Sequence, residues 1–370
     1  MAVLFESDMD PFARLPKPLV DEDFYQRTLE EGFRLYPKRK KNYLRFKTAQ
    51  RGEMLDYLPV RMDVENVSRC NYRCTMCQVS DWPGLKRADD MSLDDFKNMV
   101  DSQYGLTEIK LQGMGEPTMG KCFVEMIEYA RSKSIWVRST TNASMLHLRN
   151  NYQRIIDADI CELQVSVDGA TSDVYEKIRK GGKFKRVTEN CRLLNQYCRD
   201  VGRMRTRMWV VVQKDNMHQL ELFAPLAAEL GFDQVNFSLD LNDWGQERWR
   251  DANNLVDVHR ELDPSYLETL IAPGQKHGIE VTFWVVDEKY DTSHPDRICS
   301  WPFERGYVSS DMRLAPCCLI ANPEVSDLGD ARQLTQTWNG EKMAAFRRQH
   351  LQGNLPEFCL SCYKNPASAN

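Results

Sequence analysis

The sequence predicts an α/β fold in which parallel strands alternate with helices. Six short, apolar, strand-like runs lie between residues 61 and 239, at 62–67, 108–111, 136–140, 163–167, 208–212 and 235–239. Helical patterns separate them, for example at 92–104, 123–132, 184–199 and 219–230. Strands joined by helical segments of this length form βαβ units, whose strands are parallel. Ser92, followed by Asp95, and Asn216 are the expected helix caps.

The composition fits an enzyme better than a membrane or nucleic-acid-binding protein. The chain has 370 residues, 42% hydrophobic and 28% charged, which suits one large domain and a smaller one. A net charge of −5 argues against a general nucleic-acid partner. The first residues show neither the basic nor the apolar region of a signal peptide, and apolar runs such as 208–212 are too short to span a bilayer. We therefore expect a cytoplasmic protein that does not contact a membrane.

Three cysteines with no fourth ligand nearby are the most informative feature of the chain. Cys70, Cys74 and Cys77 form a C-x3-C-x2-C run just after the first strand-like run, whereas the next cysteine is Cys122 and the nearest histidine is His147. A structural metal site usually has four protein ligands, and a catalytic site leaves one position open. The pattern therefore favours an iron–sulfur cluster with one open iron. The alternative is an incomplete zinc knuckle, but zinc motifs normally show two matched pairs.

Residues 70–77, Cys-Asn-Tyr-Arg-Cys-Thr-Met-Cys, resemble the signature of the radical S-adenosylmethionine (radical SAM) enzymes. The resemblance implies a partial (β/α)6 barrel and a 4Fe–4S cluster whose open iron binds the methionine part of S-adenosylmethionine. It also implies reductive cleavage of this cofactor and abstraction of a hydrogen atom from a substrate. Tyr72 and Met76 become cofactor-binding residues, with Met76 beside the adenine. Ordinary core packing is the alternative for Met76.

In such barrels the loops at the carboxyl ends of the strands form the active site. Residues 113–117, Gly-Met-Gly-Glu-Pro, resemble the Gly-Gly-Glu loop of the family, in which Gly115 and Glu116 would hold the methionine amino group. Met114 stands where a second glycine is usual, and a plain glycine turn is the alternative. Asn142 follows the third strand in a sequence similar to the family's Thr-Asn-Gly. It would hydrogen-bond the cofactor or substrate, or else close an Asx turn.

Two further stretches complete the cofactor site that the resemblance implies. Ser166 and Asp168 lie in a Ser-Val-Asp-Gly sequence after the fourth strand and would point toward the ribose or carboxylate of the cofactor. Arg179 begins an Arg-x-Gly-Gly-x-Phe pattern, and its guanidinium fork suits the cofactor carboxylate. A solvated surface arginine is the alternative for Arg179.

A second cysteine set lies near the end of the chain. Cys359 and Cys362 form a C-x2-C pair that can grip one metal or cluster, and Cys299 with Cys317 or Cys318 completes four ligands. Residues 307–318 have the pattern of a hairpin, and 341–350 that of a helix. This set resembles the SPASM/twitch extension of radical SAM enzymes.

The resemblance favours Cys317 over Cys318, since the ligand usually follows a turn glycine by five positions. Met312 occupies that glycine position. No cysteine follows Cys362, so the extension resembles the shorter twitch type with one auxiliary 4Fe–4S cluster. A zinc site made by the same four thiolates is the alternative.

We expect three parts: a mostly helical N-terminal extension at 1–60, the barrel at 61–285 and the twitch/SPASM-like extension at 286–370. The basic cluster 38–41 is either a solvated stretch beside the barrel or an RNA contact. The first sixty residues lack the strand pattern of the leader-peptide recognition domain that many peptide-modifying relatives carry. This argues against a ribosomal peptide substrate.

These observations predict a radical SAM enzyme with S-adenosylmethionine, two 4Fe–4S clusters and a flavodoxin- or ferredoxin-type electron donor. The leading hypothesis is oxidoreductase chemistry, a dehydrogenation or epimerisation of a small polar molecule such as an amino sugar. The aromatic and polar loop 240–249 would suit a hydroxylated ligand or serve as a surface loop with an anchoring tryptophan. The alternatives are modification of a peptide and a non-catalytic metal- or RNA-binding protein. Five cysteines outside the ligand sets could donate a hydrogen atom, and the sequence does not choose among them: Cys122, Cys161, Cys191, Cys198 and Cys318.

Overall fold

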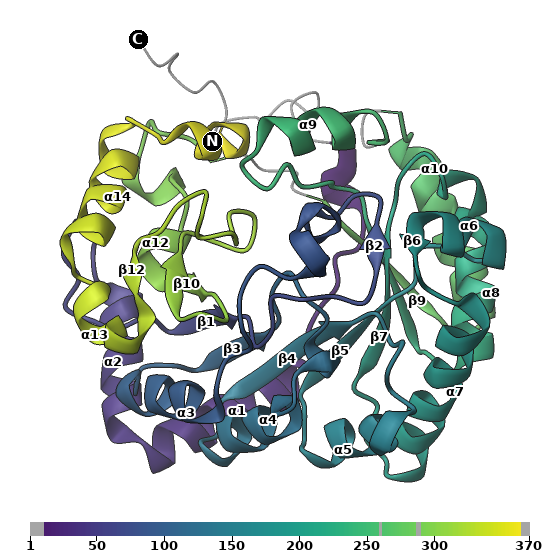
Figure 1. The fold of residues 1–370 in the computed structure, drawn as a ribbon, viewed down its shortest axis with the longest axis horizontal. Coiled ribbons are helices and arrows are strands. Elements are labelled where there is room, and N and C mark those ends of the chain that lie inside the picture. Colours follow the sequence, from purple (N-terminus) through teal and green to yellow (C-terminus); the bar gives the residue numbers. More distant parts are fainter. Residues whose placement is uncertain (1–10, 259–260, 286–289, 364–370) are drawn as a thin grey trace, which may run out of the picture.

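A ten-stranded, mostly parallel sheet forms the frame of the protein in a computed structural model, which describes residues 11–258, 261–285 and 290–363. The strand order is β12-β11-β10-β1-β3-β4-β5-β7-β8-β9, and every pairing from β10 to β9 is parallel. The parallel strands are β10 Arg305–Val308, β1 Arg61–Val64, β3 Glu108–Leu111, β4 Trp136–Thr141, β5 Glu162–Ser166, β7 Thr206–Val211, β8 Gln234–Ser238 and β9 Glu280–Trp284. The sheet curves into a partial barrel with helices outside it (Figure 1).

All six predicted strands are present, with small shifts at their ends. The first is the most different, because β1 ends at Val64 and residues 65–67 already belong to the loop. Two parallel pairings were not predicted: β9 extends the sheet beyond β8, and β10 pairs with the free side of β1. The antiparallel strands β11 Arg313–Ala315 and β12 Gly329–Asp330 continue from β10.

The helices that cover the outer face of the sheet follow the predicted pattern. They are α3 Leu93–Ser102, α4 Phe123–Ser132, α5 Asn151–Asp157, α6 Ser172–Ile178, α7 Phe184–Asp200, α8 Leu220–Leu230, α10 Pro264–Thr269 and α11 Ile271–Lys276. The helix α9 Glu247–Asn254 lies instead at the top of Figure 1, where Asn253 donates to the carbonyl of Met76. Ser92 caps α3 as expected, since its Oγ accepts from the Asp95 amide at 2.9 Å. Asn216 makes no such cap. Its side chain instead donates to the carbonyls of Asp168 and Val211, so it braces two loops at the barrel mouth.

The N-terminal helices α1 Glu22–Leu35 and α2 Pro37–Thr48 lie across the amino ends of the strands. Phe24 and Tyr25 of α1 pack their rings against Trp136, with centroids 5.0 and 5.1 Å away. Arg39, in the basic cluster 38–41, is buried and donates to the carbonyls of Lys133 and Ser134. This arginine is therefore structural, and α1 closes the bottom of the barrel.

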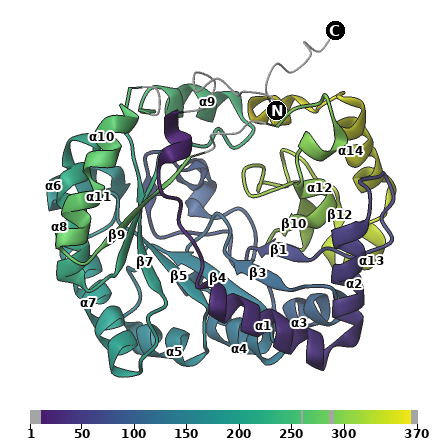
Figure 2. The same ribbon diagram turned by 180° about the vertical axis from the view of Figure 1, so that it is seen from behind.

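Before α1, the chain runs along the last strand of the barrel. The amide of Phe283 in β9 donates to the carbonyl of Pro16 at 2.8 Å. Arg207 of β7 reaches the carbonyl of Leu19 at 2.6 Å. Figure 2 shows this segment passing across β9 and β7 on its way to α1. It thus covers part of the side on which the barrel does not close on itself.

The C-terminal region continues the sheet rather than standing apart from it. Its helices are α12 Trp301–Glu304, α13 Leu334–Thr337 and α14 Glu341–Gln352, and a 3-10 segment, Glu357–Cys362, ends it. Trp338 donates to the Tyr57 carbonyl at 3.0 Å and Arg347 to that of Pro302 at 2.8 Å. The division at 285/286 stays a prediction. Residues 1–10, 286–289 and 364–370 of the predicted parts lie outside the described residues. Within those described ranges, every helix is too short or too polar to cross a bilayer.

Candidate metal centres and cofactor site

The first cysteine loop lies over the carboxyl ends of the strands. Cys74 forms part of a two-stranded ladder in which β2 Arg73–Cys74 pairs with β6 Arg179–Lys180. The Thr75 amide donates to the carbonyl of Ile178 at 3.0 Å, and the Ser80 hydroxyl donates to that of Cys74 at 2.7 Å. The loop is therefore pinned to the segment that follows α6.

The three thiols of this loop need a cationic group among them before they can ionise. Burial raises the pKa of Cys70, and the nearby Glu116 raises it further. Burial and the neighbouring Cys74 raise the pKa of Cys77 to about 12. The backbone amide of Tyr72 points at the Cys70 sulfur at 3.4 Å, which would stabilise a thiolate there. Three buried sulfurs of this kind fit an iron–sulfur cluster, whose iron stabilises the thiolates.

A single bound ion fits this donor set less well. Across the described parts of the chain, no three His, Cys, Asp or Glu side chains are arranged to hold one metal ion. A 4Fe–4S cluster is larger than an ion and holds its thiolates apart.

Glu116 joins two of the loops at the barrel mouth. The side chain is 98% buried, and its Oε1 accepts from the hydroxyls of Thr118 and Thr141, each at 2.6 Å. Its Oε2 accepts from the amide of Asn142 at 2.7 Å. Burial raises the pKa of Glu116, and these hydrogen bonds oppose the rise. Both oxygens are thus engaged by protein groups, so a direct contact with the methionine amino group stays a prediction.

Gly115 allows the loop of Glu116 to lie against the cysteine loop. A Cβ at this position would come within 2.3 Å of the Val67 carbonyl oxygen and 2.5 Å of that of Arg69. The Glu116 amide donates to the Arg69 carbonyl at 2.9 Å. This close backbone approach explains the glycine.

Asn142 brings a side-chain amide close to a cysteine sulfur from another loop of the barrel mouth. Its Nδ2 lies 3.9 Å from the Sγ of Cys70 and donates to the Oδ1 of Asn71 at 3.0 Å. Its Oδ1 accepts from the amide of Ser144 at 2.9 Å, which is the Asx turn considered as the alternative. Ala143 has a φ of 59°, at the position where the family has glycine. The turn therefore aims the amide of Asn142 at the cysteine loop.

Asp168 and Arg179 form a buried ion pair beneath the cysteine loop. The Oδ2 of Asp168 accepts from the Nε and Nη2 of Arg179, both at 2.7 Å. Burial opposes the charge on Arg179, but Asp168 outweighs it and raises the pKa. Arg179 is therefore not a solvated arginine, and because it pairs with Cys74 in the ladder it positions the loop. Ser166 ends β5, is buried and has the register partner Trp209.

Tyr72 and Met76 are both buried inside the cysteine loop. The Met76 carbonyl accepts from the Nε1 of Trp244 at 3.4 Å and from the Nδ2 of Asn253 at 3.3 Å. Gln246 donates to the side chain of Gln78 at 2.8 Å. The loop 240–249 thus packs on the cysteine loop. Trp244 anchors it there, which fits the alternative of a loop with an anchoring tryptophan.

The second cysteine set surrounds one cavity. Its lining includes Cys299, Cys317, Cys359 and Cys362 together with His350 and Tyr363. Cys318 is not part of that lining, and the charges that act on its thiol are those of Asp63, Lys110, Arg305 and Arg138, inside the barrel. The structure thus brings together the four predicted ligands, whereas the Cys318 thiol lies outside their cavity, near the charged residues of the barrel. That the four thiols bind a cluster stays a prediction.

Three residues of the C-terminal region contribute to the local structure of this site. Met312, at the turn between β10 and β11, has a φ of 62°, a conformation that favours glycine. Burial lowers the pKa of His350 to about 4, so this histidine is neutral. Tyr363 accepts from the Cys299 amide at 2.8 Å through its hydroxyl. The sequence pattern gave no reason to select His350 or Tyr363, because neither belongs to a ligand motif.

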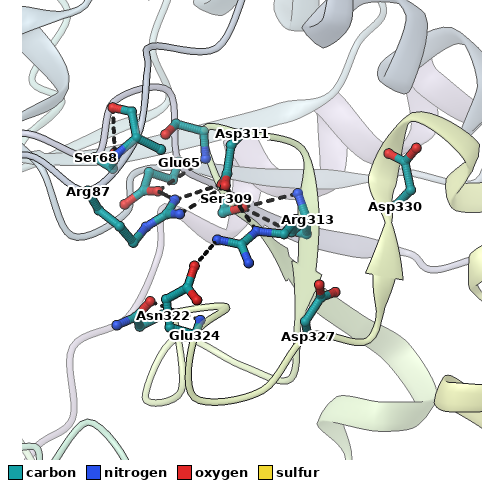
Figure 3. A network of polar contacts seen from close by, with 12 residues as sticks. Glu65, Ser68, Arg87, Ser309, Asp311, Arg313, Asn322, Glu324, Asp327 and Asp330 are labelled. Atoms are coloured by element: carbon teal, nitrogen blue, oxygen red, sulfur yellow. Dashed lines mark hydrogen bonds and ion pairs between the residues drawn. The ribbon is translucent and has the colours of Figure 1, made fainter.

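A charged network that the sequence analysis missed connects the two cysteine regions (Figure 3). Arg87 donates to Asp311 at 3.0 and 2.8 Å and to Glu65 at 3.2 Å. The same Glu65 accepts from the amides of Met114 at 3.0 Å and Ser310 at 3.1 Å. Its place just after β1, at the carboxyl end of a barrel strand, is the signal that could have identified Glu65.

Comparison with known proteins identifies both regions. Residues 66–227 match the model of the radical SAM superfamily, and residues 299–363 match SPASM, an iron–sulfur cluster-binding domain. The mycofactocin maturase MftC of Mycolicibacterium smegmatis is 26% identical over 219 residues, or 59% of this chain and 53% of that protein. The chain therefore matches about half the length of MftC. The PqqA peptide cyclase of Bradyrhizobium diazoefficiens is 21% identical over 311 residues, or 82% and 79% of the two chains.

Among solved structures, that of Streptococcus suis SuiB bound to the precursor peptide SuiA is similar in fold. The TM-score is 0.60 at 14% identity, over 83% of this chain and 69% of that one. The shared fold includes the barrel and confirms the predicted fold class.

Proposed function

Because the chain belongs to the radical SAM superfamily and carries a SPASM domain, we propose that it is an enzyme that modifies a peptide substrate. S-adenosylmethionine and 4Fe–4S clusters are its cofactors. When bound, they supply reductive cleavage of S-adenosylmethionine and abstraction of a hydrogen atom from the substrate. In this proposal Cys70, Cys74 and Cys77 hold the cluster that binds the cofactor. Four thiols hold the auxiliary cluster: Cys299, Cys317, Cys359 and Cys362.

The relatives are the observation that carries the proposal. The PqqA protein is named as a peptide cyclase and matches across 82% of this chain, and SuiB is described with a precursor peptide bound. These relatives do not support the leading hypothesis of the sequence analysis, a dehydrogenation or epimerisation of a small polar molecule. They favour the peptide alternative. The helical N-terminal segment argued against a ribosomal peptide, but a substrate can be recognised in the barrel itself.

The residues of the chain have separate tasks in this proposal. Glu116 holds the loop of Asn142 beside Cys70, so that the amide and backbone groups of that loop face the cofactor. The ion pair of Asp168 and Arg179 keeps the cysteine loop over the barrel mouth. Arg87 and Glu65 hold the SPASM hairpin against the same loop. Together they fix the orientation of the two cysteine regions, and orientation is a large part of catalytic rate enhancement.

The auxiliary cluster would accept an electron from the substrate or act as a structural clamp. A flavodoxin- or ferredoxin-type protein would supply the electron for cofactor cleavage. The role of the auxiliary cluster follows from its four cysteine ligands, because such a cluster has no open iron for a substrate. The electron donor follows from the reductive cleavage of S-adenosylmethionine that the proposal includes.

The test uses anaerobically reconstituted protein, a chemical reductant and S-adenosylmethionine, with short peptides encoded by genes next to that of this protein. Mass spectrometry should detect a mass change in one peptide, in step with the formation of 5′-deoxyadenosine. The matched control is the Cys70→Ala, Cys74→Ala, Cys77→Ala variant, which should produce neither. A mass change in an amino sugar or similar small molecule, with every peptide unaltered, would refute the proposal. Absence of cofactor cleavage in the intact protein would favour a non-catalytic metal-binding protein.

A further inference from the structure

We propose that the inner face of the barrel holds a recognition site for an acidic residue of the substrate, with Lys110 binding its carboxylate and Asp63 accepting from a neighbouring N–H group. This inference rests on the proposed function, since it names the part of a peptide that the site would take. The two residues do not appear in any of the motifs described above.

Strand geometry directs both side chains inward. Successive residues of a strand point to opposite faces, and Ile109 and Leu111 of β3 are fully buried in the core beneath the outer helices. Lys110 therefore faces the barrel interior. Asp63 is its register partner on β1, and Arg138 is its register partner on β4. The three side chains form one row across neighbouring parallel strands.

The interior beside this row is open to solvent. The side chain of Arg138 keeps 27% of its exposure although it lies in the middle of a barrel strand. Lys110 is also only partly buried. Below them, Trp136 closes the barrel against α1. The row thus lies on the inner face above Trp136 and α1, and solvent reaches the side chains of Lys110 and Arg138.

Lys110 differs from the other cations of the inner face. Each of the four arginines there lies within 4.0 Å of a carboxylate: Arg61 and Arg138 of Glu108, Arg207 of Glu162, and Arg305 of Glu304. Among the described residues, the side chain of Lys110 makes no direct ion pair and no hydrogen bond, although its charge interacts with the nearby carboxylates of Asp63 and Glu108. A lysine without a direct partner attracts a carboxylate strongly where the local dielectric is low.

Asp63 is the independent observation that points to a ligand. The residue is 95% buried, yet no hydrogen bond and no direct ion pair engages its carboxylate within the described chain, although Lys110 on the next strand acts on its charge. A buried carboxylate without a donor costs free energy, so a donor from a bound molecule would compensate it. A carboxylate together with an N–H donor is what an aspartate or glutamate residue in a peptide offers. A neutral substrate would leave the ammonium group of Lys110 without a direct charged partner.

The position of the row suits a substrate site. Lys110 lies one residue before the end of β3, and the amide of Gln112, which begins the loop to Gly113 and Gly115, donates to the Lys110 carbonyl at 3.0 Å. The Oε1 of Gln112 is buried and lacks a hydrogen-bond partner. The thiol of Cys318 is influenced by the charges of Asp63 and Lys110, and Cys318 adjoins Cys317 in the chain. The row therefore lies between the two cysteine regions.

The first experiment measures binding directly and does not depend on turnover. The probes are N-acetyl-glutamate methylamide and N-acetyl-glutamine methylamide, titrated calorimetrically into the anaerobic holoenzyme. We expect the acidic probe to bind roughly tenfold tighter, the ordinary worth of one charge-assisted hydrogen bond. Lys110→Met should abolish the preference and Lys110→Arg should retain it. Lys40→Met, a change of an exposed lysine on α2, is the matched control and should leave the preference intact. Equal binding of the two probes by the native protein, or a preserved preference in Lys110→Met, would overturn the proposal.

A second experiment separates this inference from the proposed function. Once a modified peptide is known, replacement of its acidic residues by the matching amides should raise KM roughly tenfold at one position and leave the others unaffected. If the acidic probe binds through Lys110 but no peptide is modified, the site stands and the peptide function fails. If a peptide is modified with no dependence on any acidic residue, the function stands and the assignment of Lys110 is wrong. Iron content and melting temperature of each variant should match those of the native protein.

Discussion

Arg87 grips Asp311 with both of its terminal nitrogens, at 3.0 and 2.8 Å, although 224 positions separate the two residues in the chain. Arg87 lies just beyond the first cysteine loop, and Asp311 lies in the hairpin that leads to Cys317. The same guanidinium contacts Glu65, whose side chain is 1% exposed. One arginine thus ties the end of β1, the cysteine loop and the C-terminal hairpin into a single unit, and the first prediction follows from it.

Replacement of Arg87 by alanine should lower the free energy of unfolding by about 3 kcal/mol, because it leaves the buried carboxylate of Glu65 without its charge partner. Urea unfolding followed by circular dichroism measures this loss. Arg348→Ala is the control: its pair with Glu53 is exposed, so the stability should not change measurably. An Arg87→Ala protein as stable as the native one would mean that Arg87 does not join these segments.

The contribution of Asp311 should depend on pH. Burial works to raise the pKa of Asp311, but hydrogen bonds from Arg87 and Ser309 outweigh it and hold the pKa well below its usual range. A carboxylate of this kind stabilises the fold fully above its unfolded pKa of about 3.9 and loses that effect as the pH falls. The stability difference between the native protein and Asp311→Asn, measured without clusters, should be constant from pH 8 to pH 5. It should shrink below about pH 4. A difference unchanged at pH 3 would assign the effect to packing rather than charge.

Cys317 and Cys318 should differ in their effect on iron content. With two 4Fe–4S clusters, the reconstituted protein holds roughly eight irons, and Cys317→Ala should lose about half of them. Cys318→Ala should keep all of them, because its side chain lies outside the cavity of the other four thiols. Iron and sulfide analysis of the two variants decides the matter. Loss of iron from Cys318→Ala with retention in Cys317→Ala would reverse the ligand assignment.

Glu116→Ala should weaken binding of S-adenosylmethionine roughly tenfold without loss of iron. The variant removes the acceptor of the Asn142 amide and of two hydroxyls, which frees the loop beside Cys70. Equilibrium dialysis with labelled cofactor measures the affinity. Glu116→Gln keeps the size of the side chain and should show a smaller effect. Unchanged affinity in both variants would exclude a role of this carboxylate at the cofactor.

Arg179→Ala should destabilise the fold by about 3 kcal/mol, since Asp168 is fully buried and would lose its partner. The double variant Asp168→Asn, Arg179→Met should recover part of this loss, because neither residue then leaves a buried charge. Thermal or chemical unfolding of four proteins tests the pair: the native protein, Asp168→Asn, Arg179→Met and the double variant. If the loss in the double variant equals the sum of the two single losses, the two side chains are not coupled.

Local patterns were sufficient to predict the first strands and both cysteine sets. The six strand-like runs alternate with helices, and a C-x3-C-x2-C run is visible without any knowledge of its surroundings. The hairpin predicted at 307–318 is present as β10 and β11, but the parallel pairing of β10 with β1 was missed, because β1 lies some 240 residues earlier and no local pattern encodes that pairing. Asn216 was taken for a helix cap because its residue type fits one, but tertiary contacts with Asp168 and Val211 determine its role.

The contacts within the site could not be predicted either, because they also join residues that are distant in the sequence. Arg179 and Glu116 were recognised from motifs, yet their partners come from other loops, so the sequence could not tell a ligand from a positioning residue. The choice between Cys317 and Cys318 depends on which way a turn points, and Met312 in place of glycine obscured it. The missing direct partner of the Lys110 side chain depends on residues from neighbouring strands, so the sequence alone does not reveal it.

The pairing of β10 with β1 has a consequence for any attempt to dissect the protein. A fragment that stops before β10 would leave the backbone amides and carbonyls of β1 unpaired along one side. Such an edge is a template for strands of other chains, and β1 is largely buried in the whole protein. The barrel isolated in this way would aggregate through that edge. By pairing with β1, the C-terminal segment thus protects the barrel from self-association. The barrel and the C-terminal region should therefore be studied as one unit.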